Sequence, residues 1–437
     1  MTEPSLLERE ALQFAQELIR IESVNPGVAL PAGDGEARTI EYIRERLADA
    51  GYEPLVGESV PGRANLVLRI PGSDPARGAL LAHAHVDVVA AQGEDWTHPP
   101  FGGAIADGFL WGRGALDLKN YAAVLVAIAR HFAREGVVPR RELILAFFSD
   151  EESGGVHGVR WVRREHPEWL AGATEALGEV GGFSVTLGDK RAYLVATAEK
   201  GVGWVRLRAR GDAGHASRPS ADNAVTRIAA ALARLGEHRF PATHTPALDG
   251  FLAAASRLIG VELTPDNLEE HLDELGVAGP IVQFGLRHTV TPTVVAGGYK
   301  SNVIPGEASA ELDTRSLPGP DAELKAVVQE LAGPDVELTL GSWVPPLESP
   351  TDSPLLDILQ AAIAAEDPDG VVVPYLLPAS TDNKHLASLG IAGYGFVPLR
   401  TPPDFDAYGL LHAADERIPL ESLFFSARVT ERILREA

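Results

Sequence analysis

Two short apolar runs in the first half of the chain each end in a group of charged residues. Residues 79–82 lead into His85-Val86-Asp87, and residues 143–148 lead into Ser149-Asp150-Glu151-Glu152. Neither run has a helical or an alternating period, so each predicts a strand that is buried on both faces. Consecutive carboxylates after a core strand repel one another and are costly to desolvate. A bound metal cluster is the simplest cation that would stabilise them.

Strand-like and helix-like segments alternate over residues 1–199. Residues 66–70, 79–82 and 143–148 predict strands, and residues 121–134 predict a helix. This alternation is typical of an α/β fold with a mainly parallel sheet. Ligands of such sheets bind beyond the carboxyl ends of the strands, where both charged groups are expected.

The pattern changes near residue 200. Residues 203–210 alternate arginine with apolar residues, which predicts a half-exposed strand. Further helices are expected at 223–235 and 321–331, and further strands at 293–296 and 307–313. This order predicts an α+β domain over residues 200–342, with a helical insertion at roughly 240–280. Residues 343–437, with helices expected at 354–365 and 420–435, return the chain to the first domain. That domain begins with residues 1–199.

Length and composition narrow the function classes. A chain of 437 residues is too long for one ordinary core, which favours two domains. The formal net charge of −23 argues against nucleic acid and against anionic membranes. The chain has no cysteine, so a metal would have to be bound by His, Asp and Glu.

The N-terminal segment predicts a helix of a globular protein. Ser5 and Glu8 form a capping-box pattern before an amphipathic segment, which does not resemble a signal peptide. No apolar stretch reaches the roughly 18–20 residues of a membrane span. We therefore expect a cytoplasmic enzyme.

Six positions are candidates for metal binding or for the chemistry at a metal. His85 is a possible ligand whose second ring nitrogen Asp87 could orient, and an ordinary surface histidine is the alternative. Asp117, between glycines and a predicted helix near residue 118, is either a ligand or only a helix N-cap. Glu151 and Glu152 are adjacent, so one could bind metal while the other faces the substrate, or both could belong to a solvated turn before a helix at Ser153. Two isolated residues complete the set of candidates: the carboxylate Glu179 and the histidine His412.

Taken together, these motifs resemble the di-zinc hydrolase family of aminoacylase, carboxypeptidase S, acetylornithine deacetylase and succinyl-diaminopimelate desuccinylase. The resemblance runs in order through nearly the whole chain. It also includes the strings at 96–101, 112–114, 214–217, 300–305, 313–315 and 381–382.

The resemblance implies a role for each candidate. Asp117 would bridge two zinc ions, with Co²⁺ or Mn²⁺ as possible substitutes. His85 and Glu179 would complete one metal site, and Glu152 and His412 the other. Glu151 would be the general base that activates the bridging water, and Asp87 would orient His85. Glu175 is a nearby competitor for the ligand position of Glu179.

The resemblance also implies that residues 200–342 form a ferredoxin-like lid and dimerisation domain. His215 would reach the active site of a neighbouring subunit and stabilise the oxyanion. Asn302 and Arg315 would hold the substrate, since a guanidinium suits a terminal carboxylate. These roles require a homodimer formed through the lid and a lid that closes over the site.

We therefore predict a zinc-dependent hydrolase that cleaves amide bonds of peptides or N-acyl amino acids by metal-activated water, with Glu151 as base. One alternative is a specific deacetylase or desuccinylase of amino-acid biosynthesis. The alternative from another class is an inactive homologue that serves as a binding or scaffold protein. The presence of Glu151 and all five ligands argues against that last alternative.

Overall fold

A large mixed sheet carries most of the hydrophobic core. The computed structural model describes residues 3–27, 33–319 and 321–437. Within these residues, ten strands form one sheet in the order β1-β2-β6-β3-β7-β18-β9-β16, with β17 and β8 also paired to β9. The strands are β1 (Leu55–Glu58), β2 (Ala64–Ile70), β3 (Ala79–His85), β6 (Leu143–Phe148), β7 (Ala173–Gly178), β8 (Ser184–Leu187), β9 (Lys190–Glu199), β16 (Leu347–Glu348), β17 (Val371–Leu377) and β18 (Ala392–Gly395).

The sheet is α/β in class, as expected, but it is mixed. The central strands β6, β3, β7 and β18 are parallel neighbours. Antiparallel pairs join β1 to β2, β2 to β6, and β8 and β16 to β9. Strand β17 also pairs parallel with β9. The expected parallel pairing is therefore found in the centre and between β9 and β17, and the remaining pairs are antiparallel.

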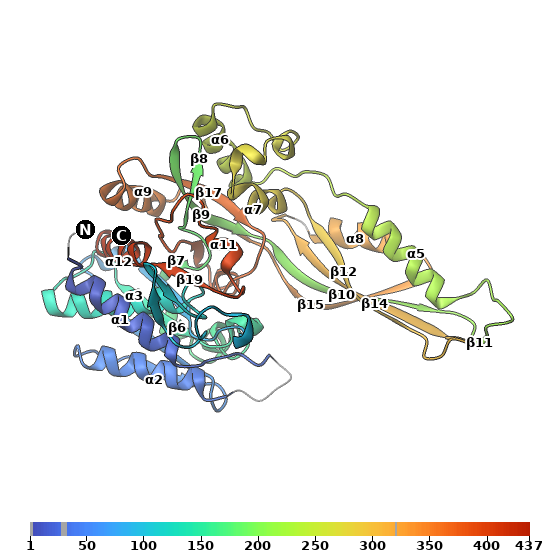
Figure 1. The fold of residues 1–437 in the computed structure, drawn as a ribbon, viewed down its shortest axis with the longest axis horizontal. Coiled ribbons are helices and arrows are strands. Elements are labelled where there is room, and N and C mark those ends of the chain that lie inside the picture. Colours follow the sequence, from blue (N-terminus) through green and yellow to red (C-terminus); the bar gives the residue numbers. More distant parts are fainter. Residues whose placement is uncertain (1–2, 28–32, 320) are drawn as a thin grey trace.

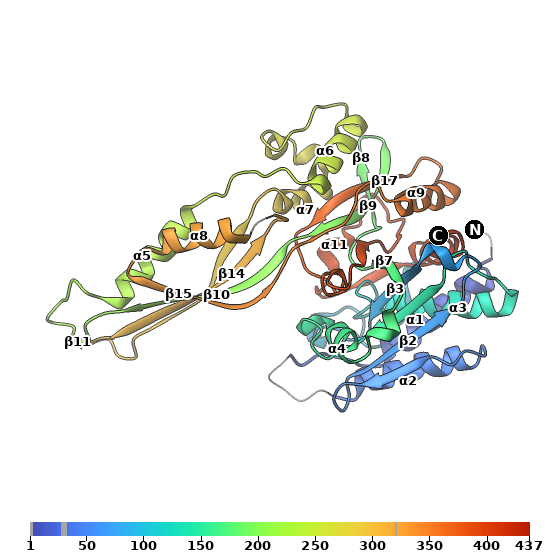
Figure 2. The same cartoon turned by 180° about the vertical axis from the view of Figure 1, so that it is seen from behind.

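Helices cover both faces of this sheet (Figures 1 and 2). Along β6, alternate residues enter two different core clusters: Leu143, Leu145 and Phe147 face one, while Ile144 and Phe148 face the other. This two-sided burial explains the lack of periodicity in the run. The helices on the two faces are α1 (Leu6–Arg20), α2 (Gly35–Ala48), α3 (Lys119–Glu135), α4 (Val159–Glu165), α9 (Pro354–Glu366), α10 (Asn383–Ala387) and α12 (Leu420–Glu436).

The N-terminal helix begins as the sequence predicts. The Ser5 side chain accepts from the backbone N–H of Glu8, and the Glu8 side chain accepts from that of Ser5, which completes the capping box. A separate small sheet, containing β4 (Ala104–Ala106), β5 (Phe109–Trp111) and β19 (Arg417–Pro419), lies beside α12. None of the helices in the described part of the chain combines the length and the hydropathy that a bilayer crossing requires.

A second, antiparallel sheet projects from the first (Figure 1). It contains β10 (Gly201–Arg210), β12 (Thr289–Gly297), β14 (Glu307–Ser316) and β15 (Val336–Val344), in the order β12-β14-β10-β15. Helices α5 (Ala224–Glu237) and α8 (Asp321–Ala332) pack on it and share its own core cluster. The strand–helix–strand–strand–helix–strand order is the one predicted from the sequence. The short pair β11 (Gly214–His215) and β13 (Val303–Ile304) lies at the far end of this projection (Figures 1 and 2).

The helical insertion packs elsewhere than we expected. Its helices α6 (Pro246–Ile259) and α7 (Ala278–Gly285) contact β17 of the large sheet. Phe251 and Ile281 accordingly belong to the main core cluster, not to that of the small sheet. The expectation that this segment lies within the smaller domain is therefore wrong, because its apolar face covers the exposed side of β17.

Candidate active site

His85 is the last residue of β3 and its side chain is buried. Its Nε2 atom lies 2.9 Å from Oδ1 of Asp117 and 3.1 Å from Oε2 of Glu179. Its Nδ1 atom lies 3.0 Å from the backbone oxygen of Asp87 and 3.5 Å from the carboxylate of that residue. A buried ring between carboxylates overturns the alternative of an ordinary surface histidine. With one ring nitrogen held by Asp87, the other is left for a ligand.

His412 approaches the same carboxylate from the opposite side. Its Nε2 atom lies 3.1 Å from Oδ2 of Asp117 and 3.2 Å from Oε2 of Glu152. The residue has φ of 62°, a left-handed conformation that costs a non-glycine residue free energy. The surrounding contacts hold the backbone there, and strained backbone of this kind is concentrated at functional sites.

Asp117 joins these two groups. One of its oxygens faces His85 and the other faces His412, so it belongs to two clusters whose ligand atoms lie within 4.8 Å of one another. It does not cap the following helix: α3 begins at Lys119, its N-cap is Leu118, and no side chain caps it. The alternative of a simple N-cap is therefore wrong. A carboxylate with one oxygen in each cluster is suited to bridging two cations.

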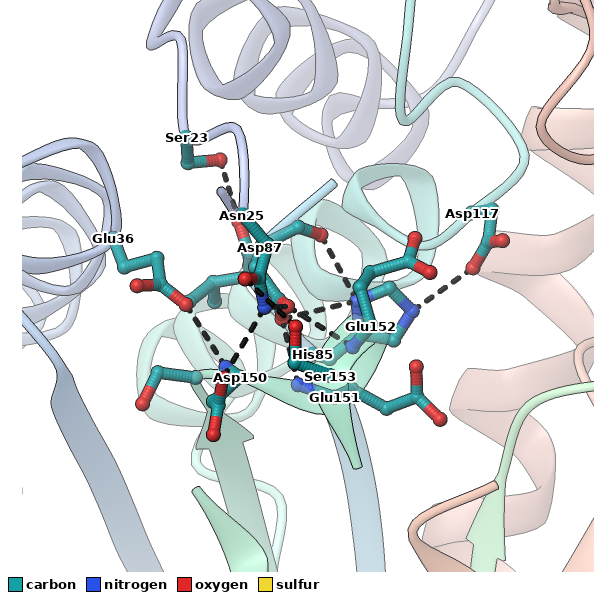
Figure 3. Close-up of polar contacts among 12 residues, drawn as sticks. Ser23, Asn25, Glu36, His85, Asp87, Asp117, Asp150, Glu151, Glu152 and Ser153 are labelled. Carbon is teal, nitrogen blue, oxygen red and sulfur yellow. Dashed lines mark hydrogen bonds and ion pairs between the residues drawn. The ribbon is translucent and has the colours of Figure 1, made fainter. Parts of the chain in front are cut away.

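Asp87 positions the acidic turn that follows β6. Its carboxylate accepts from the backbone N–H groups of Glu151 and Glu152, both at 3.1 Å, and from the side chain of Asn25 at 2.8 Å. Figure 3 shows the Glu151 and Glu152 side chains extending to the side on which Asp117 lies. The turn is a short 3₁₀ helix over Glu151–Ser153, and the next α-helix, α4, begins at Val159. The alternative of a solvated turn before a helix at Ser153 is therefore wrong about where the helix begins.

The charges of this site are strongly unbalanced. Burial raises the pKa of Glu179 to about 7, and burial together with the neighbouring Glu179 carboxylate raises that of Glu151 well above its usual range. Hydrogen bonds to Asp117 and Glu152 raise the pKa of His412 to about 10. The two histidines therefore act as the counter-charge of the carboxylates, a role that bound metal cations would take over.

The donor set fits two divalent cations. Each cluster supplies one imidazole nitrogen and one terminal carboxylate, and shares Asp117. Oε1 of Glu152 is buried and has no hydrogen-bond partner, which is costly unless a cation binds there. Mixed nitrogen and oxygen ligands suit Zn²⁺, and also Co²⁺ or Mn²⁺.

A buried network behind the site was not found from the sequence. Arg63 donates to Glu36 at 2.7 Å and to Asn25 at 3.1 Å, and lies 3.3 Å from Asp150. Glu36 in turn accepts from the backbone N–H of Asp150 at 2.8 Å (Figure 3). These contacts fix Asp150 in a left-handed conformation (φ 66°) directly before Glu151. The network joins segments far apart in the chain, and no local sequence signal marks it.

Glu175, the competitor for the position of Glu179, lies away from the site. Its carboxylate contacts the Arg141 guanidinium at 2.5 Å and the Ser353 hydroxyl at 2.5 Å. Glu179 lies just beyond the end of β7 and reaches His85. The structure therefore groups Glu179, and not Glu175, with the other candidate ligands.

A wide cavity opens above the two ligand clusters, between the two sheets. It measures about 1910 Å³ with its mouth included, and Glu151, Glu152 and His412 line its floor. Arg315 of β14 lines the wall formed by the small sheet. Two of its nitrogens bond to the Asp313 carboxylate at 2.7 and 2.9 Å, which holds the guanidinium in place.

His215 and Asn302 do not line this cavity. They lie together at the tip of the projecting sheet, where the backbone N–H of Ala216 donates to the Asn302 oxygen at 3.1 Å. The His215 side chain is exposed. Among the described residues its hydrogen-bond partner is Ser217, whose hydroxyl lies 2.8 Å from Nδ1 of His215. Within one chain the structure brings seven candidates together at the two ligand clusters, with Arg315 in the cavity wall, but it does not bring His215 and Asn302 to them.

The family model for Peptidase family M20/M25/M40 matches residues 81–436. The chain belongs to this family. Of its curated relatives, human aminoacylase-1 is 28% identical over 423 residues, which cover 94% of this chain and 91% of the relative. Mouse N-fatty-acyl-amino acid synthase/hydrolase PM20D1 is 28% identical over 404 residues, which cover 87% of this chain and 78% of the relative. As a member of this family, the protein is a hydrolase of amide bonds.

Solved M20 structures share the fold over nearly the full length. The metallo-carboxypeptidase Sso-CP2 of Sulfolobus solfataricus aligns with a TM-score of 0.72 at 16% identity, covering 98% of each chain. The di-peptidase Dug1p of Saccharomyces cerevisiae aligns with a TM-score of 0.70 at 15% identity, covering 98% of this chain and 96% of its own. The Bacillus subtilis YxeP protein, described as a dinuclear metal binding peptidase, aligns with a TM-score of 0.62 at 13% identity, covering 98% and 97%.

Proposed function

We propose that this protein is a dinuclear metallohydrolase that cleaves N-acyl amino acids or short peptides bearing a free carboxylate. The observation that carries the proposal is the position of Asp117 between two ligand clusters. We assign His85 and Glu179 to one metal, and Glu152 and His412 to the other, with zinc as the metal. Bound there, two cations would polarise the scissile carbonyl and lower the pKa of water.

Glu151 is the general base in this proposal. Its backbone is fixed by Asp87, its side chain lines the cavity floor, and its pKa is raised by burial and by Glu179. A carboxylate of raised pKa can take a proton from the attacking water and return it to the leaving nitrogen. Asp87 acts through the groups it holds, His85 and the turn at Glu151.

The small sheet supplies the substrate-binding groups. Arg315 lines the cavity at its upper wall and would bind the free carboxylate. His215 and Asn302 lie at the tip of the projection, too far along the sheet to line the cavity of their own chain. We therefore propose a homodimer through residues 200–342, in which both residues complete the site of the partner subunit. Closure of this lid about 199–200 and 342–346 would exclude water.

The other candidate functions differ in what they require. A deacetylase or desuccinylase with a narrow substrate range would use the same catalytic groups with a different substrate pocket. An inactive scaffold would not need a complete ligand set, yet both clusters and Glu151 are in place. A cytoplasmic location stays part of the proposal.

The test is a substrate survey of the zinc-loaded protein beside the Glu151→Gln variant. Each is incubated with pooled dipeptides and N-acyl amino acids, and products are followed by mass spectrometry. We expect the parent to cleave one class and the variant to lose at least about 100-fold in rate while it keeps two metals. A parent that binds no metal and cleaves nothing would contradict the proposal, whereas metal-loaded but inert protein would point to a substrate outside the pool.

A further inference from the structure

A second, apolar pocket opens directly beside the metal clusters. It is a narrow pocket, much smaller than the wide cavity, and Asp117 and Glu179 line both spaces. Its walls are apolar, and most of the side chains that form them are buried. They include Phe183, Val397, Leu399, Ala407, Tyr408 and Leu411.

The pocket contains no group that would bind a charge. Among the described residues that line it, the charged side chains are Asp117 and Glu179, both assigned to the metals. The neutral polar group is the Tyr408 hydroxyl, and the Tyr408 ring lies 6.4 Å from the ring of Phe183. A substrate carboxylate placed here would face two further carboxylates without a cation of the protein, so its place is at Arg315 instead.

The walls of the pocket are held by the fold of the large sheet. The backbones of Phe183 and Leu399 pair in an isolated β-bridge. The backbone N–H of Ser184 donates to the Leu399 oxygen at 2.8 Å. Thr401 donates to Ser184 twice at 2.9 Å, from its backbone N–H to the Ser184 hydroxyl and from its own hydroxyl to the Ser184 backbone oxygen. The pocket is therefore largely formed before substrate arrives, which lowers the cost of binding an apolar group in it.

The pocket and the wide cavity share five lining residues, three of which are Asp117, Glu179 and Val180. The other two are Tyr408 and Leu411, and Leu411 directly precedes the ligand His412. A substrate whose carbonyl lies at Asp117 can thus place its carboxylate toward Arg315 in the wide cavity and its other end in the apolar pocket. The group on the other side of the scissile carbonyl is the acyl group, or the N-terminal residue of a peptide.

We infer that this pocket is the acyl-side specificity pocket and that the preferred substrates carry an apolar acyl group or an apolar N-terminal side chain. This inference rests on the proposed function and narrows its substrate class. Each methylene that leaves water for an apolar wall favours binding, so selectivity should grow with the length of the apolar group until the pocket is filled.

The experiment measures kcat/KM for a series that differs only on the acyl side. For the amino acid that the survey identifies, N-acetyl, N-butanoyl and N-hexanoyl derivatives are compared; for a peptidase, Gly, Ala and Leu at the N-terminal position. We expect kcat/KM to rise at least about tenfold from the smallest to the largest group.

Two variants test whether this pocket is the cause. Ala407→Phe fills it, and Val397→Thr keeps its volume but adds a hydroxyl. Each should lower the ratio of kcat/KM between the largest and smallest groups, by at least about tenfold for Ala407→Phe and about threefold for Val397→Thr. Ala361→Phe, on the exposed side of α9, is the matched control and should leave the ratio unchanged.

The outcomes separate this inference from the proposed function. Cleavage of the series with no preference for apolar groups, or a preference that neither variant changes, would overturn the pocket assignment and leave the hydrolase intact. A preference for succinyl or another acidic acyl group would overturn it as well. Failure of the metal-loaded parent to cleave any member would overturn the proposed function itself.

Discussion

The carboxylate of Glu416 accepts a hydrogen bond from the backbone N–H of Asp117, at 3.1 Å. The same buried side chain also accepts from the N–H of Leu116 at 2.7 Å and from the guanidinium of Arg113 at 2.5 Å. Arg113 in turn donates to the backbone oxygen of His412 at 3.0 Å. One ion pair therefore positions both the shared carboxylate and a histidine of the second cluster.

We predict that Glu416→Gln weakens metal binding about tenfold, because outer groups that orient metal ligands contribute on this scale. The amide keeps the shape of the side chain but loses the charge that pairs with Arg113. Calorimetric titration of the chelated protein with Zn²⁺ measures the change. Glu421→Gln, an exposed position on α12, is the matched control. Equal affinities for the two variants would show that Glu416 has only a structural role.

The core strands and the ligands at their ends could be predicted from the sequence because both signals are local. An apolar run without period identified β3 and β6, and a charge directly after each run identified His85 and Glu151. Asn25, Glu36 and Arg63 carry no such signal, since they reach the site from segments that contact it only in the folded chain.

The packing of the helical insertion was harder to predict, because it too depends on contacts between segments far apart in the chain. The apolar faces of α6 and α7 are as suitable for one sheet as for the other, and only the fold shows that β17 is the one they cover. Ala379 and Ser380 line the wide cavity, whereas the apolar pocket beside the ligand clusters is formed largely by residues 397–411.

We predict that chelated protein loses stability as the pH rises from 5.5 to 8.5. The pKa of Glu179 is raised by burial to about 7, and that of His412 by Asp117 and Glu152 to about 10. The folded state therefore keeps protons that the unfolded chain releases above about 4.5 for Glu and 6.5 for His, and stability falls with rising pH. We expect Tm to fall by at least about 5 °C.

Metal-loaded protein is the control for this pH dependence. Its ligands are already deprotonated, and metal binding strengthens as protons become scarcer, so its Tm should stay level or rise over the same range. Both samples share the same surface charge, which removes general repulsion as an explanation. Parallel pH profiles of the two samples in differential scanning calorimetry would contradict the assignment of these groups to the metals.

Arg315→Met should raise KM about 10- to 100-fold for substrates with a free carboxylate, because a charge-assisted bidentate contact is lost. A substrate with an amidated terminus offers no carboxylate, so its KM should be similar in parent and variant. Steady-state kinetics with the matched pair of substrates gives both numbers. Arg206→Ala, an exposed position on β10, controls for a general loss of positive charge on the sheet. An equal rise of KM for the amidated substrate would show that Arg315 stabilises the fold and does not bind the substrate carboxylate.

His215 lies at the far end of the projection, away from the cavity of its own chain, and this position predicts activity shared between subunits. His215→Ala and Glu151→Gln should each be nearly inactive as purified homodimers. When the two are mixed and allowed to exchange subunits, half of the dimers are mixed, and each mixed dimer has one site with an intact Glu151 and an intact His215 from its partner. Activity should therefore recover to about a quarter of the parent value, following from the symmetry of a two-fold interface. If His215 served its own chain instead, each mixed dimer would contain no complete site and mixing would restore nothing.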